Sequence, residues 1–427
     1  LRRDQMKKTL TIFVCLLISL VSLFSQATNE QPTVKYAFWG NPEAIGVEKD
    51  IITAFEAKYP EIKIEPVVSS YGDYHAKLIT MIAGGMAPDV MRIDSYYFQD
   101  FTKLNAVENL DKFIARDNFS MDIYQPQGIK ECSVGNSIYG LPWATAPLYL
   151  LLNLDVFEKL NIPLPKLDWT MDDFVRIVKK IKDSSNETYG YATTFNNLDV
   201  FFPFIWAYGG DLLNPEKTEF SLNDPKGYKA FEVFSELYQS GYMPKDSITA
   251  TPDILRRWFV NGSIAMMMGS ASQILSLQNV GDIRFEAWPA PHGVNENTTV
   301  YTSNEISLSV SSKNKDAAWT FMKFLRGPEG EELYLKAKRM PPTLSDPDLW
   351  SLYLDAEKYP KLIKENSLLI SQKYGHGLPL RAGYTEVEAK IMPLVQDIVL
   401  GHVSAEKAMH EVAPQISDIL ARTGESL

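Results

Sequence analysis

Strand-like and helix-like segments alternate through the first part of the chain. In "VKYAFWG" (34–40) apolar and polar residues alternate, which predicts a strand, and "EKDIITAFEAKY" (48–59) then places its apolar residues on one helical stripe before Pro60. The pattern repeats in the next three segments, "IKIEPVV" (62–68), "YHAKLITMIAG" (74–84) and "PDVMRI" (88–93). Strands separated by helices of this length need crossover connections, so the alternation predicts an α/β fold with mostly parallel sheets flanked by helices.

The stretch "MIAGGMAPDVMRID" (81–94) places two glycines between a helix and a strand. Gly84 and Gly85 fall where a helix end favours a residue at positive φ. No Lys-Ser or Lys-Thr pair follows them, and Pro88 lacks the backbone donor that a phosphate loop would use, which excludes a nucleotide-binding cradle. Ligands of open α/β sheets bind beyond the carboxyl ends of the strands, so we expect residues 94–97 to belong to a binding site.

The later part of the chain continues in the same style. "WTMDDFVRIVKKIKD" (169–183) predicts a helix with Thr170 as N-cap and Asp173 three residues later, and "IAMMMG" (264–269) predicts a buried strand. The chain has 427 residues, enough for two cores, yet no linker rich in Pro or Ser divides it. We therefore expect two lobes joined by several crossing strands.

The first residues predict export. The segment from Met6 to Ala27 has a basic start, an apolar core and small residues at its end, which is typical of a secretory signal cleaved after Ala27. The apolar core is shorter than the roughly 20 residues of a spanning helix. A lipid anchor at Cys15 is less favoured, because Val14 precedes it and the apolar core continues past it. We expect a periplasmic or extracellular protein.

Several kinds of chemistry find no support in the sequence. The net charge is −11 without runs of Lys or Arg, which argues against a nucleic-acid partner. Only Cys132 follows the signal segment, so no disulfide is expected, and the five histidines lack metal-binding spacing. "MGSAS" around Ser270 is no nucleophile elbow, and we expect no catalytic residue, cofactor or metal. A glycosidase-like carboxylate pair stays open, because such a pair needs to be close only in space.

Aromatic residues recur beside glycines and small polar residues at the ends of predicted strands. Examples are "FWGNPE", "IDSYYF", "YGLPWATAPLY", "FIWAYGG", "AWPAPHG", "YTSNE" and "LRAGYTE". Sugars present apolar C–H faces and rings of hydroxyls, so a sugar site combines flat aromatics with carboxylates, amides and Arg. The pattern predicts a carbohydrate site.

Several of these segments resemble one family in order and spacing. "FWG", "FEAKYPEIKIE", "MIAGGMAPDVMRID", "YGLPW", "WAYGG" and "SLSVSSKNKDAAWTFMKFLRGPEGEELYL" are similar to the extracellular solute-binding proteins of ABC importers, family 1, the maltose-binding-protein-like class for sugars and oligosaccharides. The resemblance implies the class II periplasmic-binding-protein-like fold, with two α/β lobes, an interlobe cleft and three hinge crossings. It implies an N-lobe of residues 28–145 and 299–337 and a C-lobe of residues 146–298 and 338–427.

The resemblance also implies a set of cleft residues. These are Trp39, Asn41 and Glu43 after the first strand; Asp94, Ser95, Tyr96 and Tyr97 after the third; Trp143 and Tyr149 at the hinge; Asp199, Trp206, Tyr208, Gly209 and Gly210 in the second lobe; Ser270; Trp288, Tyr301 and Asn304 around the second crossing; and Arg381 and Tyr384 late in the chain. Relatives often have a stacking Trp just after the "AMMMG" strand, where this chain has Ser270 to Ser272, and this departure argues against a maltose-type ligand.

The implied function is transport rather than catalysis. The protein would bind a carbohydrate as a monomer, close around it and dock on the transmembrane subunits of an ABC permease, with no ATP site of its own. Two alternatives stay open. The same fold could hold a non-sugar solute such as a polyol phosphate or a polyamine, or the chain could be a secreted carbohydrate-active enzyme.

Overall fold

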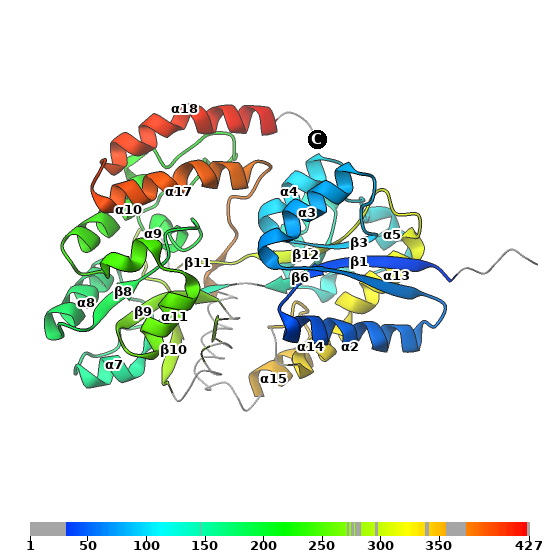
Figure 1. The fold of residues 1–427 in the computed structure, drawn as a ribbon, viewed down its shortest axis with the longest axis horizontal. Coiled ribbons are helices and arrows are strands. Elements are labelled where there is room, and N and C mark those ends of the chain that lie inside the picture. Colours follow the sequence, from blue (N-terminus) through cyan, green and yellow to red (C-terminus); the bar gives the residue numbers. More distant parts are fainter. Residues whose placement is uncertain are drawn as a thin grey trace, which may run out of the picture.

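The computed structural model describes residues 31–424 apart from 146, 271–272, 275–276, 278–282, 295–297, 338–340 and 356–372. The predicted secretory signal, with Cys15, therefore lies outside the described residues. Two lobes lie side by side in Figure 1, each built around a β-sheet with helices packed against it. Among the described residues, no helix combines the length and the apolar character needed to cross a membrane.

The first lobe contains a five-stranded sheet with the order β2-β1-β3-β12-β6. Its strands are β1 (Thr33–Trp39), β2 (Lys63–Ser69), β3 (Val90–Ile93), β6 (Leu141–Thr145) and β12 (Ser303–Leu308). In Figure 1, α3 and α4 lie on one side of this sheet and α2 and α14 on the other. The helices of this lobe are α2 (Pro42–Lys58), α3 (Tyr71–Ala83), α4 (Ser95–Lys103), α5 (Asp111–Asp117), α6 (Pro126–Glu131), α13 (Lys315–Arg326), α14 (Pro328–Lys336) and α15 (Pro347–Asp355), with a 3-10 turn at Met121–Ile123 and a small hairpin of β4 (Ser133–Val134) and β5 (Ser137–Ile138).

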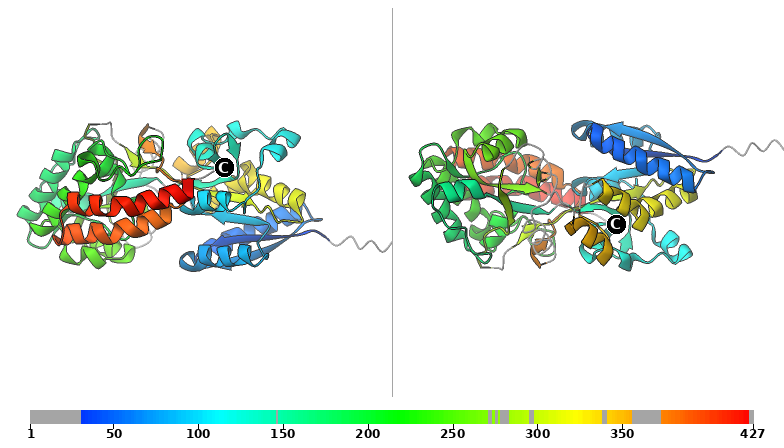
Figure 2. Two further views of the ribbon diagram at one scale, coloured as in Figure 1. Left: turned by 90° about the horizontal axis from the view of Figure 1, so that it is seen from above. Right: turned by 90° about the horizontal axis from the view of Figure 1, so that it is seen from below.

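The second lobe contains a four-stranded sheet with the order β10-β7-β9-β8. Its strands are β7 (Leu148–Asn153), β8 (Tyr189–Ala192), β9 (Ile264–Ser270) and β10 (Phe285–Trp288). The two C-terminal helices pack side by side and against α10, as Figure 2 shows. The helices of this lobe are α7 (Leu154–Lys159), α8 (Met171–Ser184), α9 (Phe202–Ala207), α10 (Pro225–Gln239), α11 (Pro252–Val260), α17 (Tyr384–Leu400) and α18 (Ala405–Gly424), with a 3-10 turn at Lys245–Thr249.

The sheets are mixed rather than mostly parallel. The pairs β1–β2, β1–β3 and β8–β9 are parallel, as the crossover pattern predicts, whereas β12 runs antiparallel to β3 and β6, and β7 runs antiparallel to β9 and β10. A parallel neighbour needs a crossover helix within the same lobe. Strand β12 instead enters its sheet from the other lobe, which reverses its direction.

The chain passes between the lobes at the hinge. It leaves the first sheet between β6 and β7 and returns between β11 (Thr299–Val300) and β12. A short parallel pair joins β11 to β13 (Gly375–His376) just before α17. Helix α15 contacts α14 of the first lobe, whereas α17 and α18 contact α10 of the second. These contacts place residues 347–355 beside the first lobe and residues 384–424 on the second.

Local sequence signals act where they were expected. Thr170 and Asp173 form a complete capping box at the start of α8. At the end of α3, Gly85 has a φ of +68°, while Gly84 keeps a φ of −81°. One glycine of the pair therefore takes the left-handed conformation that ends the helix. Helix α18 continues through Pro414.

Candidate functional site

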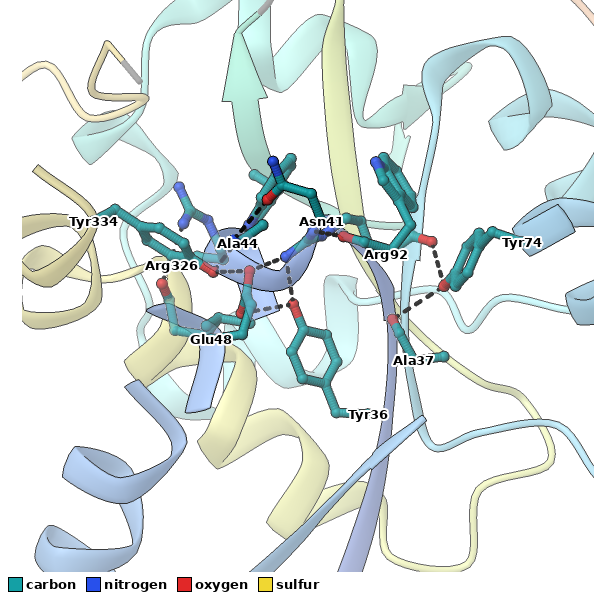
Figure 3. A network of polar contacts seen from close by, with 12 residues as sticks. Tyr36, Ala37, Asn41, Ala44, Glu48, Tyr74, Arg92, Arg326 and Tyr334 are labelled. Atoms are coloured by element: carbon teal, nitrogen blue, oxygen red, sulfur yellow. Dashed lines mark hydrogen bonds and ion pairs between the residues drawn. The ribbon is translucent and has the colours of Figure 1, made fainter. Parts of the chain in front are cut away.

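A buried ionic network supports the end of β1 in the first lobe. Arg92 on β3 is 1% exposed, pairs with Glu48 of α2 and donates from Nη2 to the Tyr36 hydroxyl at 3.1 Å. Figure 3 shows Glu48 between Arg92 and Tyr334, whose hydroxyl donates to Oε1 of Glu48 at 2.6 Å. Arg92 Nη1 also donates to the carbonyl of Trp39 at 2.9 Å. The network therefore fixes the backbone of Trp39 at the edge of the sheet.

Aromatic rings surround Trp39 at this edge. Its ring lies 5.7 Å from that of Tyr71, 5.0 Å from Tyr74 and 6.1 Å from Trp143, all edge-on. The guanidinium of Arg92 covers the Trp143 ring at 3.5 Å. Trp39 remains half-buried, so it presents part of a rigidly packed ring to the space between the lobes.

Asp94 is fixed at the carboxyl end of β3. Its carboxylate caps α4 by accepting from the Tyr96 N–H at 3.2 Å, and it also accepts from the Tyr71 hydroxyl at 3.1 Å. The Asp94 N–H donates to Nε2 of His75 at 3.1 Å. Burial lowers the pKa of His75 to about 4, so this imidazole is neutral at pH 7 and serves as an acceptor.

A hydrogen bond joins the two lobes across the cleft. The Tyr96 hydroxyl donates to Oδ2 of Asp199 at 2.5 Å, and the Tyr96 ring stacks on that of Tyr384 at 5.6 Å. Close by, the Gly383 N–H donates to Oδ1 of Asp100 on α4 at 2.8 Å. The start of α4 therefore contacts the second lobe directly.

A cavity of about 420 Å³ lies between the lobes beside this contact, and we call it the cleft cavity. It combines three aromatic residues, two aspartates and several amide and hydroxyl groups. Its polar and aromatic lining consists of Trp39, Tyr71, Asp94, Tyr96, Thr193, Thr194, Asn196, Asn197, Asp199, Ser270, Gln273, Thr302 and Asn304. Six residues of the predicted site meet here, namely Trp39, Asp94, Tyr96, Asp199, Ser270 and Asn304.

The carboxylates around the cleft cavity share a raised pKa. Burial raises the pKa of Asp94 to about 6, and the nearby Asp199 adds to the rise. Burial also raises the pKa of Asp199. On α17, burial together with Asp199 and Asp94 raises the pKa of Glu388 to about 7. Among the described residues that line the cleft cavity there is no Lys, Arg or His to balance these carboxyl groups.

A larger cavity of about 1340 Å³ lies on the other face of α4, and we call it the second cavity. Ser95, Phe98 and Gln99 line it from α4, whereas Tyr96 of the same helix lines the cleft cavity. Five other residues of the predicted site share this lining, namely Ser95, Trp206, Gly209, Gly210 and Arg381. The predicted residues are thus divided between two cavities.

Three of the residues that line the second cavity have a structural role that explains their residue type. Gly209 has a φ of +78°, and a Cβ on Gly210 would lie 2.5 Å from the carbonyl oxygen of Lys226. Arg381 donates from Nη1 to the carbonyl of Lys217 at 2.5 Å and from Nη2 to that of Leu420 at 2.9 Å. Its guanidinium therefore holds two backbone segments of the second lobe together.

The remaining predicted residues of the first lobe line neither cavity. Asn41 caps α2 by accepting from the Ala44 N–H at 2.9 Å, and Glu43 is exposed in the next turn. Tyr97 stacks on His75 with a ring separation of 4.0 Å, and Trp143 lies under Arg92.

The other predicted residues that line neither cavity come from the hinge and the second lobe. Tyr149 is 1% exposed within the core, Tyr208 packs against the core of the second lobe, and Trp288 donates to the Lys166 carbonyl at 3.3 Å. The Tyr301 hydroxyl donates to Gln125 at 3.3 Å. Tyr384 stacks on Tyr96, which does line the cleft cavity.

Some lining residues were absent from the sequence prediction. Tyr71 follows β2, and Thr193, Thr194, Asn196 and Asn197 follow β8. All of them come directly after a strand, so the rule that pointed to residues 94–97 would also have found them. Among the described residues, no group of three or more His, Cys, Asp or Glu side chains could hold a metal ion.

Asp94→Asn should change how stability depends on pH. An unfolded aspartate titrates near pH 3.9, so between about pH 4 and 6 the native state binds more protons than the unfolded state, and this group's contribution to stability falls as pH rises. Asparagine is as good an N-cap residue as aspartate, and it does not titrate.

Urea unfolding should therefore show that the free energy of unfolding of Asp94→Asn, relative to that of wild type, rises by about 1 to 3 kcal/mol between about pH 4 and 7. Asp50→Asn, at an exposed position on α2, is the control. Equal pH profiles for Asp94→Asn and wild type would contradict the burial of this carboxyl.

Comparison with known proteins finds one matching family. The sequence model described as bacterial extracellular solute-binding protein matches residues 41–332. The maltotriose-binding protein of Pyrococcus abyssi (strain GE5 / Orsay) is 24% identical over 311 residues, which cover 69% of this chain and 63% of that protein. The galactooligosaccharide-binding protein of Bacillus subtilis (strain 168) is 22% identical over 353 residues, which cover 78% of this chain and 80% of that protein.

A solved structure shares the fold. It is an ABC substrate-binding protein from Listeria monocytogenes in complex with cycloalternan, with a TM-score of 0.82 and 21% sequence identity over 92% of this chain and 100% of that one. The two-lobe architecture with an interlobe cleft is thus common to both proteins.

Proposed function

The chain belongs to the family of bacterial extracellular solute-binding proteins, and from this premise we propose that it is the extracytoplasmic binding component of an ABC importer that takes a carbohydrate into the cleft cavity. The family consists of solute-binding proteins rather than enzymes. The relatives named for maltotriose and galactooligosaccharide binding, and the fold neighbour with cycloalternan, support a carbohydrate as the ligand. The lobe boundaries at residues 145 and 298 stay part of the proposal, whereas the third boundary is proposed to lie after α15 rather than at residue 337, because α15 contacts α14 of the first lobe.

The observation that best supports this function is the composition of the cleft cavity. Trp39 and Tyr71 offer rings for the apolar face of a sugar, while Asp94, Asp199 and Asn304 offer groups for its hydroxyls. The contributing residues come from both lobes, and the volume of about 420 Å³ lies within the range of small-molecule sites. A ligand here would contact both lobes at once.

The same geometry suggests how binding would close the cleft. Asp199 of the second lobe already accepts a hydrogen bond from Tyr96 of the first. A sugar that contacts both aspartates would bind the closed arrangement better than an open one, and this difference in affinity shifts the population of lobe arrangements. The closed form would then dock on the transmembrane permease subunits as a monomer. No catalytic residue or cofactor is needed for this role.

A saccharide screen tests the proposal. A ligand present at about a hundredfold above its Kd should stabilise the protein by about 2.7 kcal/mol, which is visible as a rise in Tm. We expect a neutral or basic mono- or oligosaccharide to give this rise and to be recovered intact by chromatography. Cleavage of the saccharide would favour a secreted carbohydrate-active enzyme instead.

The charge of the lining separates the non-sugar alternatives. A polyol phosphate is disfavoured, because no Lys, Arg or His occurs among the described residues that line the cleft cavity. A polyamine would suit the carboxylates, so the screen includes spermidine. Stabilisation by spermidine and by no saccharide would overturn the carbohydrate proposal.

A further inference from the structure

Two aspartates, one from each lobe, line the cleft cavity. Asp94 of the first lobe is 5% exposed and Asp199 of the second is 7% exposed, and both line the cavity. Glu388 of α17 lies close enough for both aspartates to raise its pKa, and it accepts the Leu198 N–H at 2.7 Å. One carboxyl group from each lobe thus lines the cavity, and the carboxyl group of Glu388 lies near them.

The described part of the site supplies no cation to balance them. The nearby Arg92 is already paired with Glu48, and His75 accepts a hydrogen bond as the neutral imidazole. Oδ2 of Asp199 accepts from the Tyr96 hydroxyl, whereas its buried Oδ1 has no hydrogen-bond partner among the described residues.

Buried carboxylates of this kind favour one type of ligand. Burying an anion without a partner costs several kcal/mol unless the group becomes protonated. A neutral hydroxyl offers each carboxylate one dipole, whereas an ammonium group offers a full charge and several donors. An ammonium group of the ligand between Asp94 and Asp199 would therefore offset the free-energy cost of burying these two carboxylates, which a neutral sugar would not.

We propose that the solute is a basic sugar, a monosaccharide or oligosaccharide with a free amino group held between Asp94 and Asp199. This inference rests on the proposed function, since it names the substrate class of the same cavity. The rings of Trp39 and Tyr71 would contact the sugar face. The amide of Asn304 would bind the remaining hydroxyls.

Matched pairs of sugars test the inference by isothermal titration calorimetry. The members of each pair differ only at C2, where amines replace hydroxyls: one amine in glucosamine against glucose and in galactosamine against galactose, and two in the chitosan disaccharide against cellobiose. We expect the basic member to bind about tenfold more tightly or better, because hydrogen bonds to charged groups are about twice as strong as neutral ones. The N-acetylated disaccharide should lose this advantage, since its nitrogen is neutral.

Variants assign the preference to the two aspartates. Asparagine has the shape of aspartate, so Asp94→Asn keeps the N-cap of α4 and Asp199→Asn keeps an acceptor for the Tyr96 hydroxyl. The fold should therefore persist in both variants, and circular dichroism checks this. Each variant should reduce the preference for the amine, and the double variant should abolish it. Asp50→Asn, on the exposed surface of α2, should leave the preference unchanged.

The outcomes separate the two proposals. Equal or tighter binding of the neutral sugars, or a preference for the amine that persists in the double variant, would overturn the basic-sugar inference while the carbohydrate function stands. Failure of every saccharide, basic or neutral, to bind would overturn the proposed function and this inference with it.

Discussion

Arg92→Met should lower the free energy of unfolding by about 3 to 5 kcal/mol, because it leaves Glu48 buried without its countercharge. Glu48 is 2% exposed and Arg92 is 1% exposed, so water cannot replace the lost partner. The substitution also removes the bonds from Arg92 to the Tyr36 hydroxyl and to the Trp39 carbonyl. Urea unfolding at pH 7 measures the effect.

Two further variants define the origin of this loss. Arg116→Met removes two salt bridges of a side chain that is 49% exposed, to Asp117 and to Asp316, and it should cost no more than about 1 kcal/mol. Adding Glu48→Leu to Arg92→Met removes the unpaired charge and should recover part of the stability. If Arg92→Met cost no more than Arg116→Met, the buried ion pair would not support the sheet edge as described.

Asp199→Ala should weaken binding of the best saccharide by about 10- to 100-fold, because a hydrogen bond to a charged group contributes about 1.5 to 3 kcal/mol. The substitution removes the proposed ligand contact and also the interlobe hydrogen bond from Tyr96. Titration calorimetry on the folded variant measures the loss.

Asp211→Ala is the matched control for the choice of cavity. Asp211 is an aspartate of the same lobe whose pKa is also raised by burial, but it lines the second cavity. Its removal should change the affinity by less than about threefold. A larger loss for Asp211→Ala than for Asp199→Ala would place the ligand in the second cavity, with Trp206 and Arg381.

Local rules predicted much of the fold from the sequence. The capping box at Thr170 and the left-handed glycine at the end of α3 depend on neighbouring residues only, and both were found. The direction of β12 could not be predicted in this way. It depends on the chain returning from the other lobe, which no short sequence pattern encodes.

The site was predictable by region but not by side chain. Residues 94–97 do follow a strand at the cleft, yet α4 begins at Ser95, so successive side chains point about 100° apart around the helix. Tyr96 therefore lines the cleft cavity, Ser95 lines the second cavity and Tyr97 stacks on His75. The residue at which α4 begins and the contacts of α4 with the second lobe decide these directions, and both depend on the assembled fold.

The most direct test of the central claim is a crystal structure of the protein with the tightest saccharide of the screen. We expect an intact sugar in the cleft cavity, in contact with Trp39 and with both Asp94 and Asp199. A sugar bound in the second cavity, or a cleaved product in either cavity, would contradict it.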